Sequence, residues 1–397
     1  MEVWTDDRLQ EQFYAGSPTL DALEKTDRYN VGKIAVTPIE THRTGGYTVV
    51  PRSGSSNLNP ASNVGVNRAE WDYTHHHVLV KIEGSAIDQT DSETLSAANV
   101  VESETTSAID EARKQVTRQV FSDGSALIVA CDTTTTSTTV HLDPDKGSGI
   151  LGKGWLHPGL TVDIGTTSDE DSIVGDASIV SVDFDPTDPT ITIDSAVSTS
   201  SSDFVSIANA RQGATSFEAT GLDQIVSQSA VLGNIDPADE PLWAGADADS
   251  STTVLTLPAI YTKQRKVQER TGNSPDFVVS SFRQRQNFYT LLQGQIRFPG
   301  DSVSTGNVEG ATFAGMKFFA DLDCPDEKTY FLTKSKLFVL EKGKPYWQNQ
   351  VAGGKPLQWL QGTTAFGGLL TFRFQLATKN RNAHAAFLTL TTDVTPS

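Results

Sequence analysis

The sequence predicts an α+β protein in which a separate all-β segment interrupts the rest of the chain. Three observations predict this fold class. Two alternating segments joined by a long polar turn precede one long helical pattern, which ends near residue 121. Six short strand candidates then follow one another between residues 125 and 211. Beyond residue 212, helical and strand patterns alternate toward the C-terminus, so helices and sheets are expected to pack together there.

Residues 1–42 are expected to form an extended arm with one short helix, capped by Ser17 and with Pro18 at its first position. Residues 43–87 are predicted to form a hairpin, because "GGYTVVPR" and "AEWDYTHHHVLVKIEG" both alternate. The intervening "SGSSNLNPASNVGVNR" has the composition of a loop. A two-stranded ribbon is marginal by itself in water. We therefore expect this hairpin to lie on a neighbouring subunit.

Residues 88–124 contain the strongest helical signal. Thr90 and Glu93 fit a capping box, and Gly124 is suited to a left-handed cap at the other end. The apolar residues inside recur at steps of three and four, which predicts one buried stripe made of Ile109, Ala112, Val116 and Val120. A helix of roughly 30 residues would be a rod about 45 Å long.

Residues 125–211 are predicted to form an inserted β-barrel or sandwich domain. Six segments show strand character: "ALIVACD", "TTVHLD", "LTVDIG", "ASIVSVDFD", "TITID" and "DFVSIA". The charge is concentrated here. Residues 122–210 contain fourteen Asp or Glu and two Lys or Arg, a net charge of −12, whereas residues 261–397 carry seventeen basic and ten acidic residues, a net of +7. The acidic segment is therefore expected to be a solvent-facing module.

The remaining chain predicts a mixed α/β region. Helices are expected at "TLPAIYTKQRKVQERTG", with Pro258 near its start and Gly272 beyond its end, and at "SFRQRQNFYTLLQG". Strands are expected at "PDFVVS", "ATFAGMKFFADLD", "TYFLTKSKLFVLEKG" and "PYWQNQ". Two long strands are expected around "TKNRN" in "LLTFRFQLATKNRNAHAAFLTLTT".

The order of these elements, with "GLDQIVSQS", "PDFVVSSFRQRQNFYTLL" and "FAGMKFFADLDCP" in the second half, resembles the major capsid protein of tailed bacteriophages, the Hong Kong 97-type fold. The resemblance covers nearly the whole chain outside the insertion and implies one role for each segment. These are an N-terminal arm (1–42), an extended E-loop hairpin (43–87), the spine helix of the peripheral domain (88–124), an inserted six-stranded β-barrel (125–211), an axial domain (212–325) and the return of the peripheral domain (326–397).

The resemblance also implies a structural function. The chain would self-assemble into hexamers and pentamers of an icosahedral shell around double-stranded DNA, without catalysis and without a cofactor or metal. It would be assembled in the host bacterial cytoplasm and located in the virion capsid, with a portal protein as a partner. The resemblance leaves open whether a decoration protein binds as well. Because the hairpin starts near residue 44, there is no room for an N-terminal scaffolding segment, which favours a separate scaffolding protein. No lysine lies between Thr44 and Val80, so the covalent crosslink that some relatives form through an E-loop lysine is not expected.

Four residues are candidates for contacts between subunits: Arg43, Arg52, Arg68 and Trp71. Arginine forks pair well with carboxylates across an interface, although arginines in an exposed loop also serve solubility. Tryptophan is enriched in interfaces, but for Trp71 a place in the core of its own chain is equally open. The basic C-terminal part could contact packaged DNA electrostatically and without sequence specificity.

His75, His76 and His77 are three of the seven histidines in the chain. On a strand their side chains alternate, so they cannot converge on one metal ion, and structural packing is the expectation. A further hypothesis is that their protonation near pH 6 loosens the base of the hairpin.

Other candidate sites are weaker. The acidic run from Thr167 to Ser172 could bind calcium but lacks the spacing of an EF-hand loop, which favours a solvated loop. "GSGILGKG", Gly147–Gly154, lacks the full phosphate-loop pattern and is also expected to be a loop. Cys131 and Cys324 are expected to be buried thiols.

Three alternatives to a phage shell remain. The nearest is a bacterial encapsulin-like nanocompartment shell, which has the same fold. The "CDTTTTSTTV" segment suggests a surface adhesin or tail-fibre module, but the α/β second half argues against it. An enzyme with a β-barrel appendage is supported by no catalytic motif. No apolar run is long enough for a membrane helix.

Overall fold

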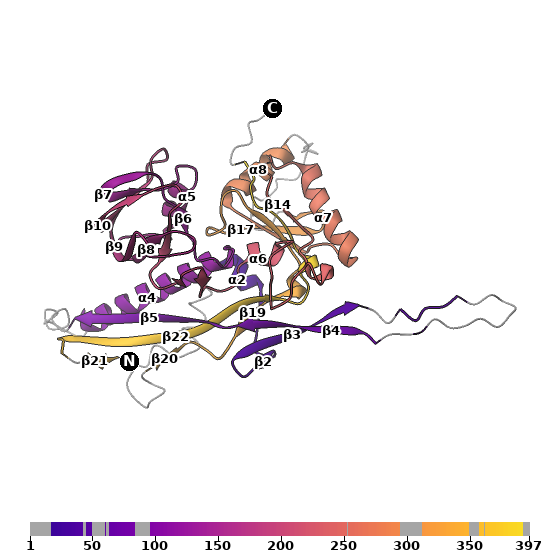
Figure 1. The fold of residues 1–397 in the computed structure, drawn as a ribbon, viewed down its shortest axis with the longest axis horizontal. Coiled ribbons are helices and arrows are strands. Elements are labelled where there is room, and N and C mark those ends of the chain that lie inside the picture. The colour runs from indigo at the N-terminus through magenta and orange to yellow at the C-terminus, as the bar shows by residue number, and fades with distance from the viewer. Residues whose placement is uncertain are drawn as a thin grey trace, which may run out of the picture.

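The structure is a computed structural model, and it describes residues 17–42, 45–49, 60, 63–83, 96–251, 253–293, 312–348, 357–360 and 362–391. It is a mixed α/β fold with several sheets (Figure 1). A long sheet runs the length of the body, and the long helix α4 lies along it. The acidic all-β segment and a mixed α/β unit sit side by side above them, and a thin hairpin projects from one end.

The N-terminal part of the described chain contains a short helix, α2 (Pro18–Ala22). Its cap is as predicted, because the Ser17 hydroxyl accepts a hydrogen bond from the Leu20 amide and Pro18 is the first helical residue. The helix is held by Asp321, whose carboxylate accepts hydrogen bonds from the hydroxyls of Ser17 at 2.9 Å and Thr19 at 2.6 Å. Three strands follow in place of an extended arm: β1 (Glu24–Thr26), β2 (Asn30–Val31) and β3 (Ile34–His42).

The hairpin is formed by β3 and β4 (Gly65–Asp72), which pair antiparallel, with β2 as the third strand of this sheet. The prediction of a strand at "GGYTVVPR" was wrong, since residues 45–49 are not in a strand and the pairing lies earlier, at residues 34–42. The second predicted strand is divided between β4 and β5 (Thr74–Glu83), which join different sheets. This one alternating segment therefore contributes one strand to the hairpin and one strand to the long sheet of the body.

The long sheet is built around β22 (Ala365–Thr378), which pairs with β5 over ten residues, from Thr74 with Phe374 to Glu83 with Ala365. β19 (Leu337–Glu341) also pairs with β22, and β1 adds to β19 in parallel. Two short strands complete the sheet, β20 (Tyr346–Trp347) and β21 (Gln358–Trp359). The predicted strand around "LLTFRFQLAT" is confirmed. The strand after "TKNRN" is only β23 (Ala385–Phe387), because the 3-10 turn Arg381–Ala383 directs this segment into another sheet.

Helix α4 (Ser96–Val120) is the predicted long helix, with 25 residues and therefore a length of roughly 37 Å. The predicted stripe is buried, since Ile109, Ala112, Val116 and Val120 are 0–6 % exposed. Ile109 packs on Val80 of β5. The capping box at Thr90 and Glu93 lies outside the described residues.

The acidic segment contains a six-stranded sheet in the order β6-β11-β8-β9-β10-β7. An isolated bridge between Cys131 and Leu142 joins the chain next to β6 to the end of β7, and a separate apolar cluster fills the interior. The six strands are β6 (Val129–Ala130), β7 (Thr134–His141), β8 (Thr161–Gly165), β9 (Val174–Asp183), β10 (Thr190–Thr199) and β11 (Phe204–Ile207).

One expectation for this segment was wrong. "GSGILGKG" is not a loop but helix α5 (Gly147–Lys153), which ends at Gly154 in the left-handed conformation, with φ of 70°. Ile150 and Leu151 are buried in the interior of the six-stranded sheet. Burial of these two side chains outweighs the low helix propensity of the glycines around them. The segment returns through the short strands β12 (Arg211–Gln212) and β13 (Thr215–Ser216).

The mixed α/β unit has a second six-stranded sheet in the order β14-β23-β18-β15-β17-β16. Both predicted helices are confirmed: α7 (Leu257–Thr271), capped by Thr256 and ended by Gly272 with φ of 76°, and α8 (Phe282–Gln293). The short helix α6 (Leu222–Val226) precedes them. The other elements are the 3-10 turns Pro241–Trp243 and Lys334–Lys336, β14 (Asp247–Asp249), β15 (Phe277–Ser280), β16 (Thr312–Phe313), β17 (Met316–Ala320) and β18 (Thr329–Leu332).

Candidate functional site

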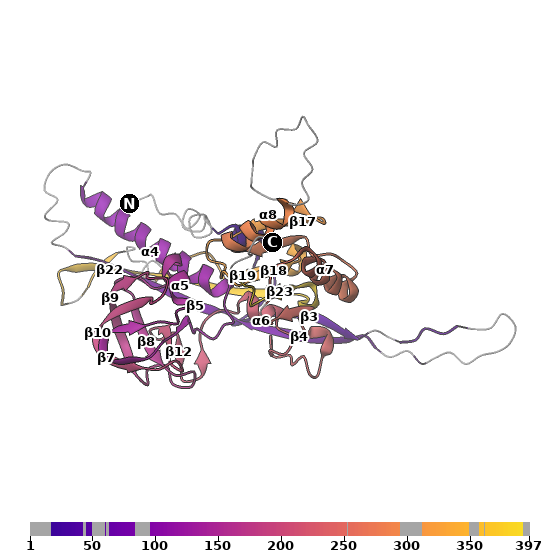
Figure 2. The same cartoon turned by 90° about the horizontal axis from the view of Figure 1, so that it is seen from above.

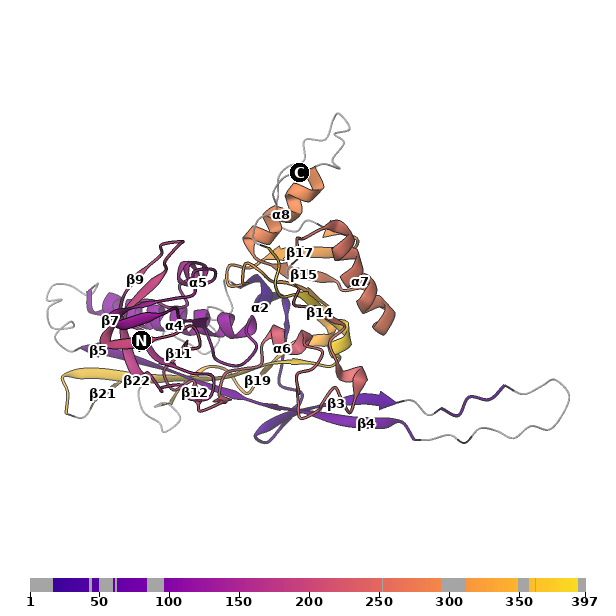
Figure 3. The ribbon, with the colours of Figure 1, turned by 45° about the horizontal axis from the view of Figure 1, so that its top comes forward.

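The projecting hairpin carries the residues that the sequence singled out for contacts. Arg68 lies on β4, opposite Pro38 of β3, and its side chain is exposed. Arg43 and Arg52 lie outside the described residues. In two further views, the hairpin leaves the molecule at the end opposite the acidic sheet (Figures 2 and 3). It therefore presents surface that the rest of its own chain does not cover.

Apolar side chains are also exposed along this hairpin. Val64, just before β4, is 46 % exposed, and Val66, on β4, is 63 % exposed. Tyr47 and Val49 are 83 % and 75 % exposed. Single exposed apolar residues are normal on a protein surface, but a row of them on a thin projection is typical of a contact surface. The sequence interpretation placed Val64 and Val66 in a segment with the composition of a loop and missed this row.

Trp71 is a residue of the core and must be removed from the set of candidates for contacts between subunits. Its side chain is 2 % exposed, it packs edge-on against Trp243 with 6.5 Å between ring centroids, and its indole N–H donates to Thr37 Oγ1 at 3.1 Å. Of the two roles that the sequence left open, the structure shows the core role. The alternation of β4 explains the difference from Arg68, since residues three apart point to opposite faces of a strand.

The three histidines alternate on β5 as predicted. His76 faces inward with Val80 and Ile82, and its ring stacks on Phe372 with 4.8 Å between centroids. His75 and His77 face outward. Within the part of the chain that the structure covers, no cluster of three metal-ligating side chains includes any of them.

Two histidines are held in the neutral form. His76 is partly exposed as a residue, but its Nε2 is buried without a hydrogen-bond partner, and desolvation together with the positive charge of Arg118 lowers its pKa to about 3. His384 is fully buried, and burial lowers its pKa to about 3 as well. Its Nδ1 accepts from the Thr333 amide at 3.4 Å, so Nε2 carries the proton and donates to Thr378 Oγ1 at 3.0 Å. For His76, this pKa contradicts the hypothesis that protonation near pH 6 loosens the base of the hairpin.

These pKa values predict acid sensitivity of the folded subunit. The unfolded chain binds a proton at each histidine below about pH 6.5, whereas the folded chain does not until about pH 3. The contribution of each neutral histidine to the free energy of unfolding is therefore full above pH 6.5. Below that pH, the contribution decreases by up to about 1.4 kcal/mol per pH unit for each histidine. Denaturant unfolding between pH 7 and 5, the range in which these histidines gain protons in the unfolded chain, should show this slope. His384→Gln should flatten it and His77→Gln, at an exposed position, should not; an unchanged slope in His384→Gln would contradict the assignment.

The acidic run near Thr167 is tied into the fold by hydrogen bonds. Glu170 accepts from the Gly213 amide at 2.5 Å, and the buried Arg211 donates to the carbonyl oxygens of Thr166 and Thr167. The carboxylates of Asp169, Glu170 and Asp171 lie close enough to share a cation. Since these contacts account for the conformation, the loop is explained without an ion.

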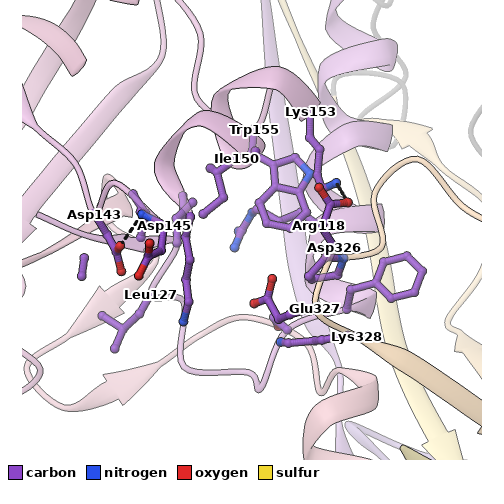
Figure 4. Close-up of a pocket in the computed structure, with 18 of the residues that line it drawn as sticks. Arg118, Leu127, Asp143, Asp145, Ile150, Lys153, Trp155, Asp326, Glu327 and Lys328 are labelled. Carbon is purple, nitrogen blue, oxygen red and sulfur yellow. Dashed lines mark hydrogen bonds and ion pairs between the residues drawn. The ribbon is translucent and has the colours of Figure 1, made fainter. Parts of the chain in front are cut away.

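A cleft of about 380 Å³ separates the acidic sheet from the mixed α/β unit (Figure 4). Two ion pairs lie among the residues that line it, Lys153–Asp326 and Lys328–Asp223. Lys153, at the end of α5, lies 3.3 Å from Asp326, and the Trp155 indole N–H donates to Asp323 at 3.1 Å. Burial raises the pKa of Asp323. These contacts connect the inserted sheet to the body.

The loop that supplies these carboxylates, Asp321–Asp326, is the most important group of residues that the sequence interpretation missed. Asp321 binds the N-terminal helix, whereas Asp323 and Asp326 bind the inserted segment. One loop therefore fixes two segments that are far apart in the sequence. The three acidic residues in the run "DLDCPD" were the signal in the sequence that could have indicated this loop.

Among the described helices, none combines the length and apolar character required to cross a membrane. The two cysteines are buried and free, as expected.

Sequence comparison gives no relatives: no family model matches the chain, and no curated protein matches it. Comparison with solved structures does find similar chains. A chain of the cyanophage A-1(L) capsid asymmetric unit matches with a TM-score of 0.52 and 10 % identity, over 94 % of this chain and 93 % of that chain. The capsid of the native GTA particle (TM-score 0.48, 8 % identity, 92 % and 88 % covered) and the SrpI encapsulin of Synechococcus elongatus PCC 7942 (TM-score 0.46, 10 % identity, 95 % and 89 % covered) are less similar. The chain therefore has the fold of a phage capsid chain.

Proposed function

We propose that this chain is the major capsid protein of a tailed bacteriophage, with the Hong Kong 97-type fold, and that it assembles into hexamers and pentamers of an icosahedral shell around double-stranded DNA. The observation that carries the proposal is the projecting hairpin with exposed Val64 and Val66, on a chain that shares its fold with the cyanophage capsid. The exposed apolar side chains of such a hairpin can be buried only by another subunit. A symmetric shell places one subunit next to the hairpin of every copy.

Each segment would then have a mechanical role. The hairpin at residues 43–87 would act as the E-loop, and α4 as the spine that keeps the subunit rigid over many copies. The acidic sheet at 125–211 would be an inserted β-barrel on the peripheral domain, the unit at 212–325 the axial domain, and 326–397 the return of the chain. Arg43, Arg52 and Arg68 would contribute intersubunit ion pairs, because arginine binds carboxylates bidentately.

The proposal includes partners. A scaffolding protein would guide curvature, a portal protein would occupy one vertex, and a decoration protein is a possible external partner. The excess of basic residues after residue 261 supports non-specific electrostatic contact with packaged DNA. The shell would assemble in the host cytoplasm and act as a structural protein, not as an enzyme.

Covalent crosslinking between subunits is not expected in these shells. The hairpin sequence from Thr44 to Val80 contains no lysine to attack a side-chain amide or carboxyl group on a neighbour. Mature particles boiled in denaturant should therefore run as one band near the 42.7 kDa monomer mass. A ladder of multimers that survives reduction would contradict this expectation.

The contents of the shell test the proposal against a nanocompartment. Particles purified from infected or lysed cells should protect double-stranded DNA from added nuclease until the shell is opened. A DNA-free shell that contains a specific cargo protein would replace the phage capsid with the encapsulin-like alternative. Absence of any particle would reject both.

A further inference from the structure

A short stretch of the inserted segment, residues 153–157, attaches this segment to the body. The apolar interior of the inserted segment is a cluster of its own, made of residues between 128 and 207. A cleft of about 380 Å³ lies between its sheet and the mixed α/β unit (Figure 4). Lys153 and Trp155 reach from the stretch to the Asp321–Asp326 loop. Polar contacts of this stretch therefore help to fix the position of the inserted segment.

His157 ends this stretch and faces α4. Its Nε2 lies 2.7 Å from Glu111 Oε2 on α4, and its Nδ1 lies 3.0 Å from the carbonyl oxygen of Pro158. Gln115 joins the same two elements, because its side-chain amide donates to Glu111 Oε1 at 2.8 Å and to the Trp155 carbonyl oxygen at 3.2 Å. His157 and Glu111 therefore meet where the inserted segment contacts the long helix.

Both ring nitrogens of His157 face oxygen atoms that only accept hydrogen bonds. A neutral imidazole carries one N–H, so it satisfies one of these oxygens and turns a lone pair toward the other. The imidazolium carries two N–H groups and satisfies both. The geometry therefore favours the protonated ring, and loss of the proton places a lone pair against the carbonyl or the carboxylate oxygen.

The charges around His157 act in the same direction. Glu111 raises the pKa of His157 above its ordinary value near 6.5, against the opposing effects of burial and of Lys114 on α4. The contact is therefore complete below about pH 6.5 and is lost as the pH rises through the raised pKa.

The other titratable groups near His157 lie in a groove of about 710 Å³ between β5, α4 and the inserted segment. Those that line it are His75, His76, His77, Glu111 and Glu218. Burial lowers the pKa of His75 and of His76, and Glu218 is paired with Arg118. On the other side of the stretch, burial raises the pKa of Asp323, the acceptor of the Trp155 N–H. An experiment must therefore separate His157 from these groups.

We propose that His157 and Glu111 form a pH-sensitive latch. It holds the inserted segment on α4 while the imidazole is protonated and loosens it when the proton leaves. The chain leaves the body after α4 and returns through β12 and β13, so these two connections are the pivots. The contacts of Lys153 and Trp155 with the Asp321–Asp326 loop keep the segment attached. The expected change is therefore a wider range of positions and not a separation.

Distances between two spin labels test the latch in the unassembled full chain. The labels are attached at Val180→Cys on β9 and Tyr261→Cys on α7, positions that are 59 % and 51 % exposed. The natural Cys131 and Cys324 are 2 % and 0 % exposed, so they stay unlabelled. Double electron–electron resonance should give a distance distribution at least twice as wide at pH 9 as at pH 6.

Three variants of the labelled chain assign this response. His157→Gln and Glu111→Gln should each give the same width at both pH values. His141→Gln is the matched control, because His141 Nδ1 also lies close to a carboxylate, 2.6 Å from Asp188, but both residues belong to the inserted segment. This control should respond like the parent chain. An equal width at both pH values in the parent chain would overturn the latch, and so would an undiminished response in His157→Gln.

NMR titration of the histidine rings is the second measurement. The His157 signal is the one absent from His157→Gln. Its midpoint should lie above pH 6.5 in the parent chain and should fall in Glu111→Gln, whereas a parent midpoint at or below 6.5 would overturn the latch. Both measurements use the unassembled subunit. Failure of the latch therefore leaves the shell function intact, and a chain that forms no shells leaves the test of the latch intact.

Discussion

Replacement of Arg381 by alanine should lower the free energy of unfolding by about 4 kcal/mol or more. The guanidinium is fully buried and has no carboxylate partner among the described residues. It donates to four carbonyl oxygens in and after α6, those of Gln224 at 2.8 Å, Ile225 at 3.0 Å, Ser227 at 2.6 Å and Ala230 at 2.7 Å. The last carbonyls of a helix have no partner within it, so Arg381 acts as its C-terminal cap from a distant segment.

Denaturant unfolding of the unassembled subunit measures this effect. Arg381→Lys keeps the charge but offers fewer donors, so it should fall between the wild type and alanine. Arg68→Ala is the matched control, because the same residue type is removed from an exposed site, and a change within about 0.5 kcal/mol is expected. A loss in Arg381→Ala no larger than in this control would show that water replaces the guanidinium without cost.

Replacement of Glu218 by alanine should cost about 3–5 kcal/mol, since it leaves Arg118 buried and unpaired. The two side chains are 3 % and 2 % exposed and form an ion pair, and Arg118 also donates to Gln115 Oε1 at 2.9 Å. Arg118 lies at the end of α4, before the inserted segment, and Glu218 lies after it. The pair therefore joins the two places where the chain leaves and re-enters the body.

The exposed pair Arg265–Glu269, with side chains 61 % and 56 % exposed, supplies the control. Glu269→Ala should change stability by less than about 1 kcal/mol. The double variant Arg118→Met/Glu218→Leu should recover most of the loss, because an apolar pair of similar volume no longer requires a buried charge. If the double variant is as unstable as Glu218→Ala, the loss comes from packing and not from the unpaired arginine.

Local rules predicted the features that a few neighbouring residues determine. The caps at Ser17 and Gly272 depend on side chains and backbone within one turn, and both are in place. The alternation of His76 and His77 follows from strand geometry, whichever sheet the strand joins. The buried stripe of α4 follows from helical spacing in the same way.

Features that depend on distant packing were missed. Helix α5 forms because Ile150 and Leu151 fill the interior of a sheet whose strands come from both sides of it in the sequence. Trp71 is buried because Trp243, more than 170 residues away, lies against it. The strand at residues 34–42 replaces the predicted one at "GGYTVVPR" because β2 and β4 both pair with it. None of these partners can be identified from local periodicity.

The candidate site was predictable only in part for a related reason. The hairpin and its exposed Arg68 followed from a polar segment with no core of its own. The apolar row around Val66 is a property of a surface that forms when distant strands meet. The carboxylates of the Asp321–Asp326 loop likewise acquire their roles from Thr19, Lys153 and Trp155, which the fold brings to them.

Negative-stain electron microscopy of the purified native material shows whether this chain forms a shell. If this chain is a shell subunit, the images should show closed particles of uniform size with icosahedral outlines, in which the chain is the dominant protein. Particles made by this chain should also disassemble into single subunits or capsomers. They should not disassemble into an enzyme complex with a small, fixed number of subunits. Native material that contains only monomers or small oligomers, under conditions in which the subunit is folded, would contradict the capsid assignment.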